Sequence, residues 1–210
     1  GILSIGFGLL FALVATQEHA APGKKKSPDG DGNGMSMARL LLIMTIAATS
    51  GSMLFNFSTS SNYELLTHKI RTILQDPAEI GMLLAVVYAL ASLTQLLIGN
   101  LLDKIALKPL YLSVITLQLV SLLVALNAEG WLFYGAQIFF MAGIFAAIPF
   151  TDAMVVRFVD DAMRSRVSGM RLTVALGASS LAVWLIGPVV KQAGFTALLW
   201  VMFATATITF

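Results

Sequence analysis

The fold is decided by a short charged stretch and by the apolar run that leads into it. The stretch is GNLLDKIALK, residues 99–108, and the run is IGMLLAVVYALASLTQLLIG, residues 80–99. Asp103, Lys104 and Lys108 therefore stand between two segments that are otherwise apolar. An α-helix needs about 20 apolar residues to cross a hydrocarbon core of ~30 Å. The pattern predicts two membrane-spanning helices joined by a tight, charged hinge.

The composition extends this pattern to the whole chain. Of its 210 residues, 58% are hydrophobic and 11% are charged, and the mean hydropathy is +0.86. Soluble domains carry about 25% charged residues, so a soluble fold of this size could not bury so many apolar side chains. The sequence predicts an all-α, polytopic membrane helix bundle. Because it contains no cysteine, a disulfide framework and a cysteine-ligated metal site are excluded within it.

Apolar runs and the polar stretch between them divide the chain. Residues 1–15 are expected to be the end of a preceding transmembrane helix, because they lack the basic leading region of a signal peptide. Residues 16–38, rich in Gly, Pro, Asp and Lys, are expected to be a flexible linker. Residues 39–210 are expected to be a transmembrane bundle, with both ends of the sequence cut from a larger protein. The expected spans are 39–63, 80–102, 109–126, 131–157, 172–190 and a truncated 196–210.

The basic residues indicate which loops face the cytoplasm. Alternate loops on one side hold ten of the thirteen Lys and Arg residues, and cytoplasmic loops carry such an excess. We therefore expect a multi-pass protein of the bacterial inner membrane with a cytoplasmic linker. The ten residues are Lys24, Lys25, Lys26, Arg39, Lys104, Lys108, Arg157, Arg164, Arg166 and Arg171.

Polar residues recur along one face of four expected spans. In the 80–102 span they run from Tyr88 to Asp103 at steps of four, three, four and four, which is one stripe of an α-helix. Polar side chains in a bilayer turn toward protein or water, so these faces are expected to surround a wet cavity. The 109–126 span, with Ser113, Thr116 and Gln118, has no clean stripe and is expected to be mainly lipid-facing, as is 196–210. The cavity candidates are Asn56, Tyr63, Tyr88, Ser92, Gln95, Gln137, Ser180 and Trp184.

Some of these residues have a second interpretation. Serine and threonine also join helices in bilayers through simple packing. Trp184 lies about 16 Å along its helix from Thr173, so it is either a cavity wall or a core residue. Asp152 and Glu64 lie near opposite rims, which does not favour a proton-carrying acid. Asp152 could instead form a rim ion pair with Arg157 or with a basic residue of the neighbouring loop.

The hinge resembles the loop signature of the major facilitator superfamily, G-x-L-x-D-R/K-x-G-R/K-R/K. Ala106 stands where the signature has glycine, and Leu107 where it has a basic residue. The stretch MRSRVSGMR, residues 163–171, resembles the loop between the fourth and fifth helices of a facilitator half, and the linker resembles the central loop. The resemblance implies the six-helix C-terminal half of such a fold, with part of a preceding helix. The matching hinge residues are Gly99, Leu101, Asp103, Lys104 and Lys108.

The resemblance implies a secondary transporter that moves a small solute by alternating access between two halves. In that family the first, second, fourth and fifth helices of each half line the cavity, which is the division that the stripes predict. Asp103 would then be a latch against a helix N-terminus of the missing N-terminal half, or else part of a solvated topogenic loop. The latch and loop candidates are Gly99, Asp103, Lys104, Lys108, Asp152, Arg157, Arg164, Arg166 and Gly169.

The alternatives to a transporter are an intramembrane enzyme and a receptor-like or scaffolding protein. An intramembrane enzyme is not expected, because His19 and His68 lie in loops and no paired acid lies at membrane depth. A receptor-like or scaffolding protein of the same fold stays as the alternative. The expected partners are a small-molecule solute, the lipid bilayer and the missing N-terminal half. No signal for a cofactor, a metal or a nucleic acid appears, and the neutral stripes favour a polar or amphipathic solute.

Overall fold

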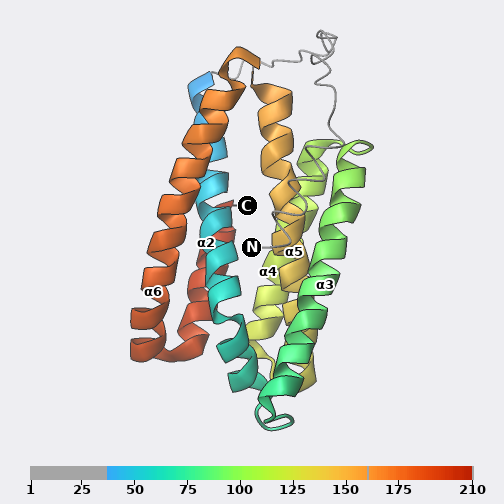
Figure 1. The fold of residues 1–210 in the computed structure, drawn as a ribbon, viewed down its shortest axis with the longest axis vertical. Helices are drawn as coiled ribbons and strands as arrows, with labels where there is room; N and C mark the ends of the chain where they lie inside the picture. Colours follow the sequence, from blue (N-terminus) through green and yellow to red (C-terminus); the bar gives the residue numbers. More distant parts are fainter. Residues whose placement is uncertain (1–36, 160, 210) are drawn as a thin grey trace, which may run out of the picture. The chain divides into compact units, whose positions relative to one another are not determined.

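The computed structural model of the chain describes residues 37–159 and 161–209, and these fold into helices joined by short connections (Figure 1). Five of the helices in this part are long and apolar enough to cross a membrane, so the prediction of an all-α membrane bundle is confirmed. The expectations for residues 1–36, which include the preceding helix and most of the linker, lie outside the described residues. The helices are α2 (Met37–Ile70), α3 (Pro77–Leu102), α4 (Leu107–Asn127), α5 (Gly130–Phe158) and α6 (Asp161–Thr209).

The charged hinge of the sequence is the tight connection between α3 and α4. α3 ends at Leu102, Asp103 occupies its C-cap position, and α4 begins at Leu107. The backbone N–H groups of Lys104 and Ile105 donate to the carbonyl oxygen of Leu101, at 3.0 and 2.8 Å, which closes the last turn. We call the end of the bundle that contains residues 103–106 the hinge end. The α2–α3 and α4–α5 connections lie at the opposite end (Figure 1).

Two helices begin or end differently from their expected spans. α2 continues seven residues beyond the expected end at 63, because Leu65, Leu66 and Ile70 find buried positions. The helix α6 begins at Asp161, so the stretch 163–171 is helical and not a loop. An acidic residue in the first turn and the ion pair from Arg164 to Asp161, at 2.8 Å, support this early start.

Glycine permits two of the sharp changes of direction in the second half of the chain. Gly130 opens α5 with a φ of 61°, and Gly194 interrupts α6 with a φ of 79°. Both lie in the left-handed region that glycine adopts without steric cost. At Gly194 the chain turns back, so that α6 consists of two helical segments running in opposite senses (Figure 1).

The helices pack as two groups around apolar clusters, of which two are large. α6 packs most extensively on α2, and α5 packs on both α3 and α4, whereas α5 and α6 share little contact. The larger cluster includes Phe57, Leu66 and Phe133 and fills the opposite end. The smaller cluster includes Leu102 and Phe150 and fills the hinge end. The bundle therefore has a more extensive apolar core away from the hinge.

A buried amide joins α4 to α5. Gln118 is buried, and its Nε2 donates to the carbonyl oxygen of Gly143 at 2.9 Å. A Cβ at Gly143 would lie 2.7 Å from Cγ of Gln118, so only glycine allows this close approach. Gln118 thus points between helices, although it lies in a span that the sequence predicted to be mainly lipid-facing.

We expect Gly143→Ala to lower the free energy of unfolding by about 1–3 kcal/mol, because the added methyl group overpacks the contact with Gln118. Chemical unfolding in detergent micelles measures the change. Gly135→Ala is the matched control, because Gly135 lies in the same helix and a Cβ there would have no neighbouring atom within 4 Å. Alanine at Gly135 should be neutral or stabilising by up to ~1 kcal/mol. Equal effects at the two positions would contradict the close approach.

Candidate functional site

Near the middle of the membrane-length helices, a side-chain hydrogen bond joins α2 to α6. The Nδ2 atom of Asn56 donates to Oγ of Ser179 at 2.8 Å and to the carbonyl oxygen of Ser52 at 2.9 Å. Ser180, which the stripe predicted as the cavity residue, is exposed and donates to its own helix at Leu176. Periodicity could not decide which of the two adjacent serines faces α2, because the helix rotation was unknown.

A second group of polar side chains joins three helices nearer the opposite end. Asn62 of α2 donates from Nδ2 to the hydroxyl oxygen of Tyr88 on α3, at 3.2 Å. Gln137 of α5 donates from Nε2 to Oδ1 of Asn62, at 2.6 Å. The Oε1 atom of Gln137 is buried and has no partner among the described residues. These contacts hold α2, α3 and α5 together inside the bundle.

Asn62 is the residue that the sequence stripe missed. It lies six residues after Asn56, which turns it to another side of α2. The available signal was chemical, because an asparagine in an apolar span needs a hydrogen-bonding partner. Gln137, a cavity candidate, is 3% exposed, so it lies within the helix contact and not on an open surface.

The other cavity candidates lie at or near the surface of the bundle. Tyr63 and Ser92 are exposed, and Gln95 is half-buried. Trp184 is 67% exposed, so it is not a core residue of the described bundle. The extensive helix contacts of the described chain do not include one between α3 and α6, so Ser92 and Gln95 lie apart from Trp184.

A hollow of about 400 Å³ lies away from all of these residues, between α4 and α5. Its walls are mainly apolar and include Leu117, Val124, Trp131 and Phe139. It therefore offers a lipid-like environment and few hydrogen-bonding groups, and it does not belong to the polar faces.

At the hinge end, an arginine of α5 caps the last turn of α3. Arg157 donates from Nη2 to the carbonyl oxygen of Leu102, the last residue of the helix. A cation at a helix C-terminus is favourable because it meets the negative end of the helix dipole. Asp103, Lys104 and Lys108 are exposed beside it, and Gly99 is half-buried.

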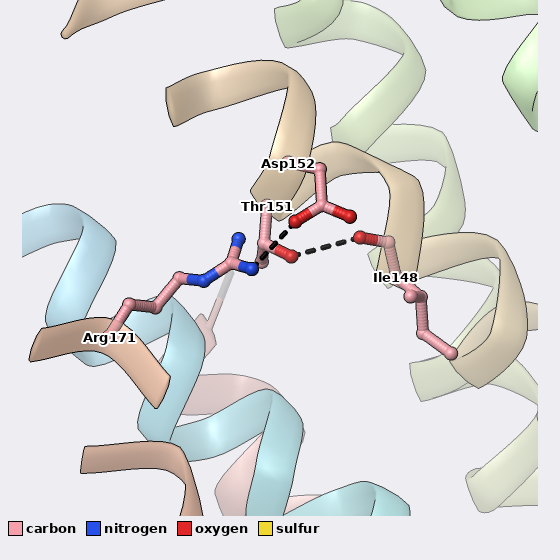
Figure 2. A network of polar contacts seen from close by, with 4 residues as sticks. All are labelled: Ile148, Thr151, Asp152 and Arg171. Carbon is pink, nitrogen blue, oxygen red and sulfur yellow. Dashed lines mark hydrogen bonds and ion pairs between the residues drawn. The ribbon is translucent and has the colours of Figure 1, made fainter. Parts of the chain in front are cut away.

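A second arginine pairs with the carboxylate of α5. Arg171 of α6 lies 2.6 Å from Asp152, measured from Nη2 to Oδ1 (Figure 2). The partner of Asp152 is thus Arg171 and not Arg157. Arg164 donates from Nη2 to the carbonyl oxygen of Val156 at 3.1 Å. The remaining candidates of this stretch, Arg166 and Gly169, are exposed.

We expect Asn62→Leu to lower the free energy of unfolding by about 1–3 kcal/mol, because it leaves the buried Gln137 amide unpaired. Adding Gln137→Leu removes that amide, so the double variant should be more stable than the sum of the single changes predicts. Chemical unfolding in detergent micelles measures both effects.

The control for this cycle is Asn127→Leu. Asn127 is an exposed asparagine of α4 that bonds within its own helix, to the carbonyl oxygen of Leu123. Its replacement should change stability little. Strict additivity of the Asn62 and Gln137 changes would contradict the interhelical contact.

Comparison with known families adds to these observations. The model of the family described as Major Facilitator Superfamily matches residues 40–210, which is most of the chain. No curated protein matches the chain. Proteins of this family are membrane transporters of small solutes and not enzymes. With its membrane-length apolar helices and this match, the chain is a multi-pass membrane protein that belongs to the Major Facilitator Superfamily.

Proposed function

We propose that this chain is the six-helix C-terminal half of a secondary transporter that moves a small polar or amphipathic solute by alternating access. Family membership implies a secondary transporter. Contacts and exposures of the described residues support the solute class, the position of the solute face and the role of the hinge.

The observation that carries the proposal is a polar face, uncharged through its middle part, on membrane-length helices. α3 exposes an apolar face with Leu93, Leu96 and Leu97. Next to this face lie the exposed Ser92 and the half-buried Gln95. Lipid can cover the first face. The polar positions need water or another protein surface beside them, because hydrocarbon offers no hydrogen-bonding groups.

The same reasoning applies to the exposed polar face of α6. Thr173, Ser180 and Lys191 are exposed along the face that also carries Trp184. Since α3 and α6 do not pack on each other extensively, a second six-helix half would bring a covering surface to both faces. We infer that the solute passes between the two halves.

The side chains of this face favour a neutral hydrogen-bonding solute. Asn56, Tyr63, Tyr88 and Gln95 offer amide and phenol groups, and Trp184 offers an aromatic surface. Asn62 and Gln137 would support the face from behind, by holding α2 and α3 in place.

We place the hinge end on the cytoplasmic side of the bacterial inner membrane. The described part of this end carries Lys104, Lys108 and Arg166 as exposed cations, and the alternate connections carry few. Cytoplasmic loops are enriched in such residues. The linker 16–38 would then be cytoplasmic as well.

Uptake of a panel of radiolabelled neutral polar solutes into proteoliposomes tests the transport function. We expect saturable uptake of at least one solute class, and exchange when the same solute is loaded inside. Folded, monodisperse protein without uptake or exchange would favour the receptor-like alternative.

The solute face can be tested with Ser180→Phe. A ring on this face should lower the initial uptake rate by about tenfold or more, equivalent to roughly 1.4 kcal/mol, because it obstructs the passage. Leu181→Phe is the matched control, since Leu181 is an exposed apolar residue of the same helix, turned about 100° from Ser180. The control variant should leave the initial uptake rate unchanged. An equal loss of uptake rate in both variants would remove α6 from the solute path.

The hinge can be tested with Asp103→Asn. If the carboxylate meets a helix N-terminus of the other half, its neutralisation removes about 0.3–2 kcal/mol from one conformation. We expect transport to fall by up to about thirtyfold, as 1.4 kcal/mol is a factor of ten, while membrane insertion stays intact. Transport kinetics measure the loss of transport, and membrane fractionation measures insertion. Unchanged kinetics would leave Asp103 as part of a solvated topogenic loop.

A further inference from the structure

The hollow of about 400 Å³ between α4 and α5 has a floor of small residues. Ser121 and Ala136 are buried there, and a Cβ at Gly135 would have no neighbouring atom within 4 Å. Larger side chains, half-buried or exposed, line the rest of the hollow, and these are Leu117, Val120, Val124, Trp131, Leu132 and Phe139. The hollow is therefore a recess with a narrow floor and bulky walls, open on the surface of the bundle.

The length of the hollow along the helices is close to the depth of one lipid leaflet. On α5 it extends from Trp131, one residue after the helix start, to Phe139, which lies about 14 Å along the axis. On α4 it extends from Val124 to Leu117, about 5 to 15 Å from the helix end at Asn127. A hydrocarbon core of ~30 Å gives about 15 Å to each leaflet. The hollow therefore lies within the leaflet at the opposite end and stops near the middle of the membrane.

A tryptophan stands at the rim of the hollow. Trp131 is 54% exposed, and its ring meets that of Tyr134 edge-on, with the centroids 5.9 Å apart. The hydroxyl of Tyr134 donates to the carbonyl oxygen of Leu83 on α3 at 3.0 Å, which fixes the tyrosine. Tryptophan side chains gather at the level of the lipid headgroups. A lipid whose headgroup lies beside Trp131 would therefore direct its acyl chain along the hollow.

The walls of the hollow exclude another transmembrane helix. Helices pack closely in bilayers where small residues recur at steps of four. On α5 these steps place Gly135 between Trp131 and Phe139, and on α4 Leu117 lies four residues before Ser121. The bulky residues hold a helix backbone away from the floor, whereas an acyl chain, which is a single file of methylene groups, can reach it. Dispersion contacts along such a chain are small one by one and favourable together.

The residues beside the rim disfavour an anionic headgroup. Asn127 and Glu129 are exposed there, and the α4–α5 connection, residues 128–129, carries no cation. The carboxylate of Glu129 would repel a headgroup with a net negative charge, whereas it would attract the ammonium group of a zwitterionic phospholipid. The charge at the rim therefore favours a zwitterionic lipid.

We propose that the hollow between α4 and α5 is a binding site for one acyl chain of a zwitterionic phospholipid in the leaflet at the opposite end. The site goes beyond the proposed transport function and does not depend on it, because none of the residues of the solute face lines the hollow. It gives a role to the recess that the polar stripes leave unexplained.

Quenching of tryptophan fluorescence by a brominated lipid tests the site in the membrane-reconstituted protein. The vesicles contain phosphatidylcholine with bromine atoms on one acyl chain, diluted into unbrominated, anionic phosphatidylglycerol. The chain has three tryptophans, so Trp184→Phe/Trp200→Phe leaves Trp131 as the reporter and Trp131→Phe/Trp184→Phe leaves Trp200. Trp200 is the matched control, because it is also 54% exposed and its ring meets Phe203 edge-on.

We expect Trp131 to reach half of its maximal quenching at a brominated fraction about threefold lower than Trp200 does, which is the size of one exposed charge contact. Gly135→Phe, added to the Trp131 reporter, fills the hollow and should bring this fraction back to the value of Trp200. Gly81→Phe is its matched control and should keep the threefold difference. Gly81 is an exposed glycine about 6 Å from the start of α3, in the same leaflet, and a Cβ there also has no neighbouring atom within 4 Å.

Equal half-quenching fractions for the two reporters would overturn the site, because the hollow would then hold bulk lipid without preference. An unquenched Trp131 would overturn it as well, because a protein surface would then cover the hollow. A threefold difference that persists in Gly135→Phe would place the lipid elsewhere. The comparison of the two reporters changes no residue of the floor, so it decides the question even if Gly135→Phe does not fold.

The quenching experiment is independent of transport, because it is carried out without a solute. Proteoliposomes that show the threefold difference but no uptake would remove the transport function and keep the lipid site. Uptake together with equal half-quenching fractions would remove the lipid site and keep the transport function.

Discussion

The structure depends on one constraint, which is that a polar group inside a hydrocarbon layer must find its partner within the protein. α-Helices meet this requirement for the backbone, but asparagine and glutamine side chains must meet it across helices. Asn56, Asn62, Gln118 and Gln137 each do so, to a hydroxyl, a phenol, a carbonyl or another amide. The four amides therefore act as cross-links that fix which helices are neighbours.

The two ends of the bundle are held by different kinds of contact. At the opposite end, the larger apolar cluster packs around Phe133, and buried Lys69 donates from Nζ to the carbonyl oxygen of Ala128 at 3.2 Å. At the hinge end the apolar cluster is smaller, and arginines supply the ties between α3, α5 and α6. Closely packed apolar side chains resist rearrangement, whereas a partly exposed ion pair can break and form again. This difference favours movement at the hinge end over movement at the other.

Charge and polarity are arranged along the bundle in a way that suits a transporter. The polar faces of α3 and α6 are uncharged through their middle parts, and the ionised residues gather near the helix ends. A neutral passage between charged rims imposes little electrostatic barrier on a polar solute, while the rims anchor the helices in the membrane. The family match and this arrangement point in the same direction.

By itself, the sequence determined the class of protein, because hydrophobicity, helix length and the hinge motif are local properties. Apolar runs predicted membrane-length helices, and residues 99–108 indicated the family that the match to residues 40–210 confirms. Stripes also singled out Asn56 and Tyr88, because a helix repeats every 3.6 residues whatever surrounds it. The structure places both in contacts between helices, and their role as cavity residues stays a prediction.

Only the tertiary structure decided which polar residue meets which. Ser179 rather than Ser180 faces Asn56, Asn62 joins three helices from outside the stripe, and Arg171 pairs with Asp152. Each of these depends on the rotation and the axial offset of one helix against another. Packing of side chains from distant parts of the chain sets the rotation and the axial offset of each helix. The periodicity of a single helix carries no information about either.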